Sequence, residues 1–125
     1  MSRVVFLNGE YKDYNNALTH VEDRGYQFAD GVYEVFSVKN GKLIDYTGHI
    51  NRLSRSLNEI SIKYPINIRS ILFHMRNIIR KNLIVDGLIY LQITRGVAKR
   101  DFKFPKNLDS TITIIGNNIP SDEYD

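Results

Sequence analysis

The sequence predicts an α+β domain in which two helices pack on a mostly antiparallel sheet. Short segments of alternating apolar residues, two Asn-Gly turns and two stretches of apolar residues at helical spacing support this fold class. A chain of 125 residues, 42% of them hydrophobic, can bury one core. We therefore expect a single small domain over residues 1–118, with 119–125 as the start of an interdomain linker or a C-terminal tail.

The first hairpin is expected at residues 3–11, RVVFLNGEY, because Asn8-Gly9 is a typical two-residue turn between strands. A polar segment then leads to a loop, EDRGYQFADG, which has two glycines and enters the next strand directly. Acidic residues in such a loop usually form hydrogen bonds or face solvent. We expect this structural role for Asp23 and Asp30.

The second hairpin is expected at residues 32–46, with its turn at Asn40-Gly41. Successive side chains of a strand point to opposite faces of a sheet. This alternation places Val32, Glu34, Phe36 and Val38 on one face and Tyr33, Val35 and Ser37 on the other.

Two helices follow, each with its own boundary residues. Thr47 is a plausible N-cap for residues 48–60, and Asn67 can cap residues 68–82, which follow Pro65. Each stretch carries a single apolar stripe, so both helices are expected to pack on the sheet.

Two further strands complete the predicted sheet. Residues 88–96 and 110–118 are rich in Ile and Thr, as strands often are. A basic loop, residues 95–106, connects them, and such a loop usually faces solvent.

Composition excludes several function classes. The net charge of +3 is too small to indicate nucleic-acid binding, and no apolar run is long enough to span a membrane. The chain has no cysteine, and its three histidines, His20, His49 and His74, lack the spacing of a metal site. We expect a cytoplasmic protein with no metal, no nucleic-acid partner and no membrane partner, and structural roles for the histidines.

The residues alone leave the candidate site open. Asp23, Asp30 and Glu34 can be read as paired carboxylates for acid–base chemistry or as ordinary loop and strand acids. Arg52 lies away from the apolar stripe of its helix, where arginines usually face solvent. Tyr33 can be a half-buried aromatic residue with its hydroxyl satisfied.

Several segments, in order, resemble the N-terminal domain of the fold-type IV (class IV) pyridoxal-phosphate aminotransferases, and within that family the D-amino acid (D-alanine) aminotransferases. The resemblance covers nearly the whole chain. It rests on EDRGYQFADGVYEV (22–35), HINRL (49–53) and IYLQITRG (89–96), followed by Arg100 and Phe104-Pro105.

The resemblance implies a role for three residues and one cofactor. Arg52 matches the arginine that binds the phosphate of pyridoxal phosphate, a task that suits a guanidinium fork. Tyr33 and Arg100 match residues that hold the substrate carboxylate, with the arginine reaching in from the partner subunit of a homodimer. Phe102 stands where the related enzymes have a histidine, which puts a preference for D-alanine-like substrates in question.

The resemblance also implies a Schiff-base lysine, and none of the eight lysines matches its position. We therefore expect the N-terminal portion of a D-amino acid transaminase of the D-alanine and 2-oxoglutarate type, inactive alone and with weak or no cofactor binding. The alternatives are a non-catalytic dimerisation or binding module, half of a split enzyme, or, within the family, a branched-chain aminotransferase or aminodeoxychorismate lyase. A nucleic-acid binder acting through residues 95–106 is a further alternative.

Overall fold

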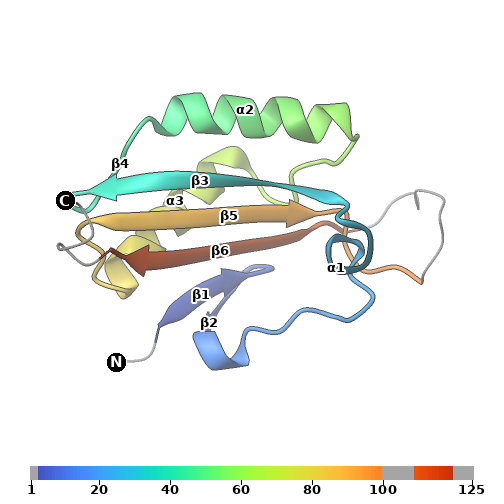
Figure 1. The fold of residues 1–125 in the computed structure, drawn as a ribbon, viewed down its shortest axis with the longest axis horizontal. Helices are drawn as coiled ribbons and strands as arrows, with labels where there is room; N and C mark the ends of the chain where they lie inside the picture. Colours follow the sequence, from blue (N-terminus) through green and yellow to red (C-terminus); the bar gives the residue numbers. More distant parts are fainter. Residues whose placement is uncertain (1–2, 100–108, 120–125) are drawn as a thin grey trace.

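A six-stranded antiparallel sheet with the strand order β2-β1-β6-β5-β3-β4 forms the centre of the fold. The computed structural model describes residues 3–99 and 109–119 (Figure 1). The strands are β1 (Val4–Leu7), β2 (Glu10–Asp13), β3 (Gly31–Lys39), β4 (Lys42–Leu43), β5 (Gly87–Thr94) and β6 (Thr111–Asn118), and the helices are α1 (Arg24–Phe28), α2 (Tyr46–Glu59) and α3 (Ile68–Lys81), with a 3-10 turn at Tyr14–Asn16. The predicted α+β class is confirmed.

Both predicted hairpins are present, and their turns have the predicted chemistry. Asn8 and Gly9 connect β1 to β2 with φ values of 50° and 91°, and Asn40 and Gly41 connect β3 to β4 with 52° and 75°. Two consecutive positive φ values suit the right-handed twist of a hairpin, and Asn-Gly adopts them most easily.

The strands β3, β5 and β6 form the long central part of the sheet. Each of the two ladders pairs eight residues, with Tyr33 opposite Gln92 and Tyr90 opposite Ile115. The predicted alternation along β3 is confirmed, because Phe36 and Val38 are buried while Tyr33 is 63% exposed. The two faces of the sheet therefore have different environments.

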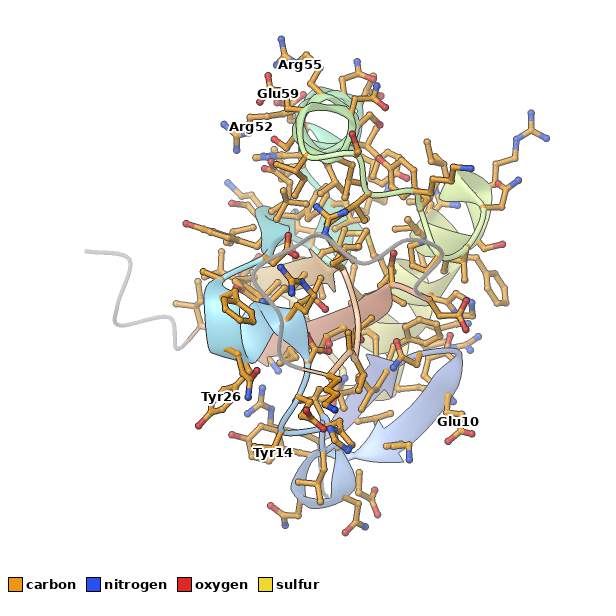
Figure 2. The ribbon with its side chains drawn as sticks, turned by 90° about the vertical axis from the view of Figure 1, so that its right-hand side faces the viewer. Glu10, Tyr14, Tyr26, Arg52, Arg55 and Glu59 are labelled. Carbon is orange, nitrogen blue, oxygen red and sulfur yellow. The ribbon has the colours of Figure 1, made fainter. Side chains whose placement is uncertain are left out.

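Two long helices cover the buried face. Figures 1 and 2 together show α2 and α3 on the same side of the sheet. Their apolar stripes meet the inward side chains of the central strands in one continuous core, which includes Leu53 and Leu57 of α2, Ile71, Met75 and Ile78 of α3, and Phe36, Ile89, Leu91 and Ile114 of the sheet. None of the described helices is long and apolar enough to cross a membrane.

One helix boundary differs from the prediction. Asn67 caps α3 as expected, because its side chain accepts a hydrogen bond from the backbone N–H of Arg69. Thr47, however, lies inside α2, which begins at Tyr46 after Asp45. Asp45 has a φ of 52° and makes no side-chain cap hydrogen bond, so the turn geometry rather than a cap starts this helix.

The segment expected as a plain loop contains the short helix α1. Asp23 caps it by accepting a hydrogen bond from the backbone N–H of Gly25, and Ala29 ends it with a left-handed φ of 54°. Five residues are too few to show helical periodicity in a sequence. The helix brings the start of β3 against the end of β5.

Candidate functional site

A carboxylate on the buried face of β3 binds two basic side chains of α2. Arg52 donates two hydrogen bonds to Glu34, from Nε to Oε2 (2.8 Å) and from Nη2 to Oε1 (2.6 Å). His49 Nδ1 lies 2.8 Å from Glu34 Oε1, and since an ionised carboxylate only accepts, His49 donates here. Arg52 Nη2 and His49 Nδ1 are 3.5 Å apart because both donate to the same oxygen.

The position of these three residues follows from local structure. Glu34 has the inward register of β3, between Val32 and Phe36, and its side chain is only 4% exposed. His49 and Arg52 are three residues apart on α2 and therefore lie on the same side of the helix. The pairing of α2 with β3 turns that side toward the carboxylate.

The electrostatics of the group favour its charged form. The hydrogen bond from Arg52 lowers the pKa of Glu34, and this effect together with the His49 contact outweighs the opposing effect of burial. The same carboxylate raises the pKa of Arg52, to which the Tyr33 phenol adds a smaller contribution. The ion pair thus remains charged across the neutral range.

Part of the Arg52 guanidinium group remains available to bind a ligand. Its Nη1 group makes no hydrogen bond with any residue in the two described ranges, and the side chain is 60% exposed. Figure 2 shows Arg52 projecting from α2 on the side turned away from α3. A guanidinium group with one edge held and another edge free can bind an oxyanion from solvent.

Tyr33 lies on the opposite face of the sheet from Glu34 but close to the same end of β3. Its ring stacks on that of Tyr90, with centroids 5.6 Å apart and planes 22° apart. The phenol makes a small electrostatic contribution that raises the pKa of Arg52. Its hydroxyl can donate a hydrogen bond to a carboxylate or phosphate.

A buried ion-pair cluster supports this end of β3. Asp30 Oδ2 accepts hydrogen bonds from Arg24 Nε and Arg95 Nε, both at 2.7 Å. Arg95 also donates to the backbone carbonyl of Ile60 (2.6 Å), which ties the end of β5 to the end of α2. Burial alone would raise the pKa of Asp30, but the hydrogen bonds from Arg95 and Arg24 outweigh it and lower that pKa.

Asp23 and two glycines complete the support. Asp23 Oδ1 accepts hydrogen bonds from Gly25 N (2.8 Å) and Thr94 Oγ1 (2.7 Å). A Cβ atom at Gly31 would lie 2.7 Å from the carbonyl oxygen of Ile93, and one at Gly25 would lie 2.3 Å from a Thr94 methyl carbon. These glycines allow the loop to pack directly on β5, and the two loop aspartates have the structural role that the sequence indicates.

The remaining predicted residues contribute less to the described site. Arg100 and Phe102 lie outside the described residues, as does most of the 95–106 loop. His74, on α3, contacts Tyr11 of β2 through a 2.5 Å hydrogen bond and is far from Arg52 in the chain. No cluster of three or more metal-ligating side chains exists within residues 3–99 and 109–119.

Sequence reasoning missed the link between Glu34, His49 and Arg52. The available signal was an acid at an inward strand position, which needs a basic partner when buried. His49 was expected to be structural, and the structure adds that it holds the same carboxylate as the candidate ligand Arg52.

A family model described as amino-transferase class IV matches residues 31–125. Among curated proteins, the D-alanine aminotransferase of Staphylococcus haemolyticus is 43% identical over 101 residues, which are 81% of this chain and 36% of that protein. The D-alanine aminotransferase of Listeria innocua is 37% identical over 122 residues, which are 95% of this chain and 42% of that protein.

Solved structures agree on the fold. The branched-chain amino acid aminotransferase of Escherichia coli superimposes with a TM-score of 0.87 at 19% identity, over 95% of this chain and 40% of that one. The chain thus spans about two fifths of the length of the proteins that it matches.

Proposed function

The chain belongs to the class IV aminotransferases, and from this membership we propose that it supplies the N-terminal part of a D-alanine aminotransferase-like enzyme. The observation that carries the proposal is the Arg52–Glu34 pair, which orients a guanidinium group and leaves one of its edges free. The identity to two D-alanine aminotransferases favours this substrate class over the branched-chain and lyase alternatives. The enzyme's substrates are an amino acid and a 2-oxo acid.

The residues present fit the phosphate group of pyridoxal phosphate. Arg52 offers Nη1 to the phosphate, while Glu34 holds Nε and Nη2 and thereby sets the plane of the guanidinium group. His49 stabilises the carboxylate that orients the arginine. When bound, the cofactor supplies an electron sink for loss of the substrate Cα proton.

Tyr33 serves the substrate rather than the cofactor in this proposal. Its phenol is exposed, and stacking on Tyr90 restricts its ring, so that its hydroxyl can donate to a substrate carboxylate. Arg100, from the partner subunit of a homodimer, neutralises that carboxylate. The electrostatic influence of Tyr33 on Arg52 supports neighbouring carboxylate and phosphate ends in this proposal.

We also propose that the 125-residue chain alone does not transaminate. None of its described lysines makes a hydrogen bond or ion pair with Arg52, Glu34 or Tyr33. Where no lysine amine reaches the site, covalent attachment of the cofactor and proton transfer by a lysine are not available. The chain should neither consume D-alanine with 2-oxoglutarate nor give a one-lysine adduct after borohydride reduction with pyridoxal phosphate.

The proposed role of Arg52 in phosphate binding can be tested by comparing pyridoxal phosphate with pyridoxal, which lacks the phosphate. We expect the phosphorylated compound to bind more tightly, and Arg52→Gln to remove about tenfold of that advantage because one charge-assisted contact is lost. Arg55→Gln is the matched control, since Arg55 is an exposed arginine of the same helix (Figure 2). Calorimetry measures both affinities.

Two results would contradict the proposal. Equal affinities for the two compounds would remove the phosphate anchor and favour a non-catalytic module. If Arg52→Gln and Arg55→Gln lose equal affinity for pyridoxal phosphate, the binding reflects general charge attraction and not a specific contact with Arg52.

A further inference from the structure

A cavity lies on the helical side of the sheet, away from Arg52. It has a volume of about 510 Å³ and is formed by the β4 hairpin, the first turn of α2 and one face of α3. Arg52 projects from the side of α2 turned away from α3, so the two sites are separate (Figure 2). The cavity is within the size range of small-molecule sites.

Aliphatic side chains form one wall of this cavity. Leu72 and Ile79 come from α3, and Leu43 comes from β4. Leu72 and Ile79 are seven residues apart and therefore lie on the same helix face. This wall can receive an apolar group of a ligand.

Two cations line the same cavity without an acidic counterpart. Lys42 and Arg76 are exposed, and neither side chain makes a hydrogen bond or ion pair with any residue whose position is described. The cavity lining includes no Asp or Glu. An anion in the cavity would therefore meet two positive charges.

Tyr46, which also lines the cavity, has a buried hydroxyl. Tyr46 stacks on Phe36, with ring centroids 6.0 Å apart, and its hydroxyl is buried with no hydrogen-bond partner among the described residues. Burial raises the pKa of Tyr46, which keeps the hydroxyl protonated, while the nearby Arg76 guanidinium acts in the opposite direction. A buried donor without a partner favours a ligand that brings an acceptor.

We propose that this cavity binds a small carboxylate with an aliphatic tail. The carboxylate accepts the Tyr46 hydrogen bond and pairs with Arg76 and Lys42, and the tail lies against Leu43, Leu72 and Ile79. The aliphatic wall favours such a ligand over inorganic phosphate, which has no apolar part. The proposal is independent of the function proposed for Arg52.

The test uses hexanoate as the probe and the 125-residue chain labelled with ¹⁵N. Saturable shifts of the backbone amides of Leu43, Tyr46, Leu72 and Arg76 are expected. Acetate, which lacks the tail, and hexanamide, which lacks the charge, are each expected to bind at least about tenfold more weakly. Equal binding of hexanamide and hexanoate would overturn the proposal, as would saturable shifts confined to other residues.

Three variants complete the test. Arg76→Gln is expected to weaken hexanoate binding about tenfold, whereas Arg69→Gln, two turns earlier on α3 and outside the cavity, should leave it unchanged. Tyr46→Phe should weaken binding severalfold without destabilising the fold, because its hydroxyl has no protein partner to lose. Equal effects of the two arginine variants, or unaltered binding by Tyr46→Phe, would contradict the assigned contacts.

Discussion

At the scale of single residues, Glu34 is the centre of the candidate site. It accepts hydrogen bonds from Arg52 and His49 while only 4% of its side chain is exposed. An acid in this position is stable only because its partners are in place, since a buried carboxylate without them would be strongly disfavoured. The site and the stability of the chain are therefore linked through one side chain.

Replacing Glu34 by Gln should lower the free energy of unfolding at pH 7 by about 1–2 kcal/mol, through loss of hydrogen bonds to a charged group. The pKa of Glu34 is lowered from its ordinary 4.5, so its stabilisation is complete above about pH 4.5 and is lost as the pH falls through the lowered value. The difference between the two proteins should therefore shrink in acid. Urea unfolding at several pH values measures it.

Glu59→Gln provides the control for this prediction. Glu59 is an exposed acid at the end of α2 (Figure 2) and forms no ion pair with a described residue. It should change stability by less than about 0.5 kcal/mol at any pH. A Glu34→Gln deficit that stays constant from pH 7 to pH 3 would contradict the assigned ionisation.

At the scale of elements, α1 depends on contacts from distant parts of the chain. Asp30 joins Arg24 of α1 to Arg95 after β5, and Arg95 continues to Ile60 at the end of α2. A helix of five residues is not stable by itself. Its order comes from this cluster and from packing of Gly25 on Thr94.

Asp30→Asn should therefore cost about 3 kcal/mol of unfolding free energy, because it removes the negative charge that two buried guanidinium groups share. Hydrogen exchange at the backbone amides of α1 should accelerate more than exchange in α3. Glu10→Gln removes an exposed ion pair with Lys12 at 3.4 Å and should cost less than about 0.5 kcal/mol. Similar losses in both variants would show that the cluster contributes no more than a surface pair.

The elements also show what could be predicted from the sequence. Both hairpins could be predicted, because Asn8-Gly9 and Asn40-Gly41 determine their turns locally. The cap of α3 at Asn67 could also be predicted. The helix α1 could not be predicted, because its stability depends on long-range ion pairs.

For the site, the sequence identified individual residues but not how they interact. Arg52 and Tyr33 were singled out through family resemblance, whereas the Glu34 contacts span 15 and 18 positions and depend on how α2 docks on β3. The start of α2 at Tyr46 was missed because Asp45 adopts a left-handed conformation without a side-chain cap. Docking and backbone geometry are properties of the folded chain, and local patterns do not encode them directly.

At the scale of the whole molecule, the sheet has one face covered by helices and one with exposed apolar residues. Tyr33 is 63% exposed, and Val35 and Leu88 are each 37% exposed on the latter face. Neighbouring exposed apolar side chains favour contact with another protein surface. We expect the chain to form a homodimer through this face.

Leu88→Lys should weaken self-association about tenfold or more, because a charged group would be placed in the apolar contact. Phe73→Lys is the control, since Phe73 is 60% exposed on α3 on the other side of the sheet. Sedimentation equilibrium measures the association constants. A monomeric wild-type chain, or equal effects of both variants, would contradict a dimer through this face.

The paired hydrogen bonds from Arg52 to Glu34 also affect how strongly an anion can bind. A free arginine side chain samples many rotamers, and fixing it on a ligand opposes association through lost conformational entropy. Here folding has already selected the orientation, so an arriving phosphate would meet a donor that needs little rearrangement.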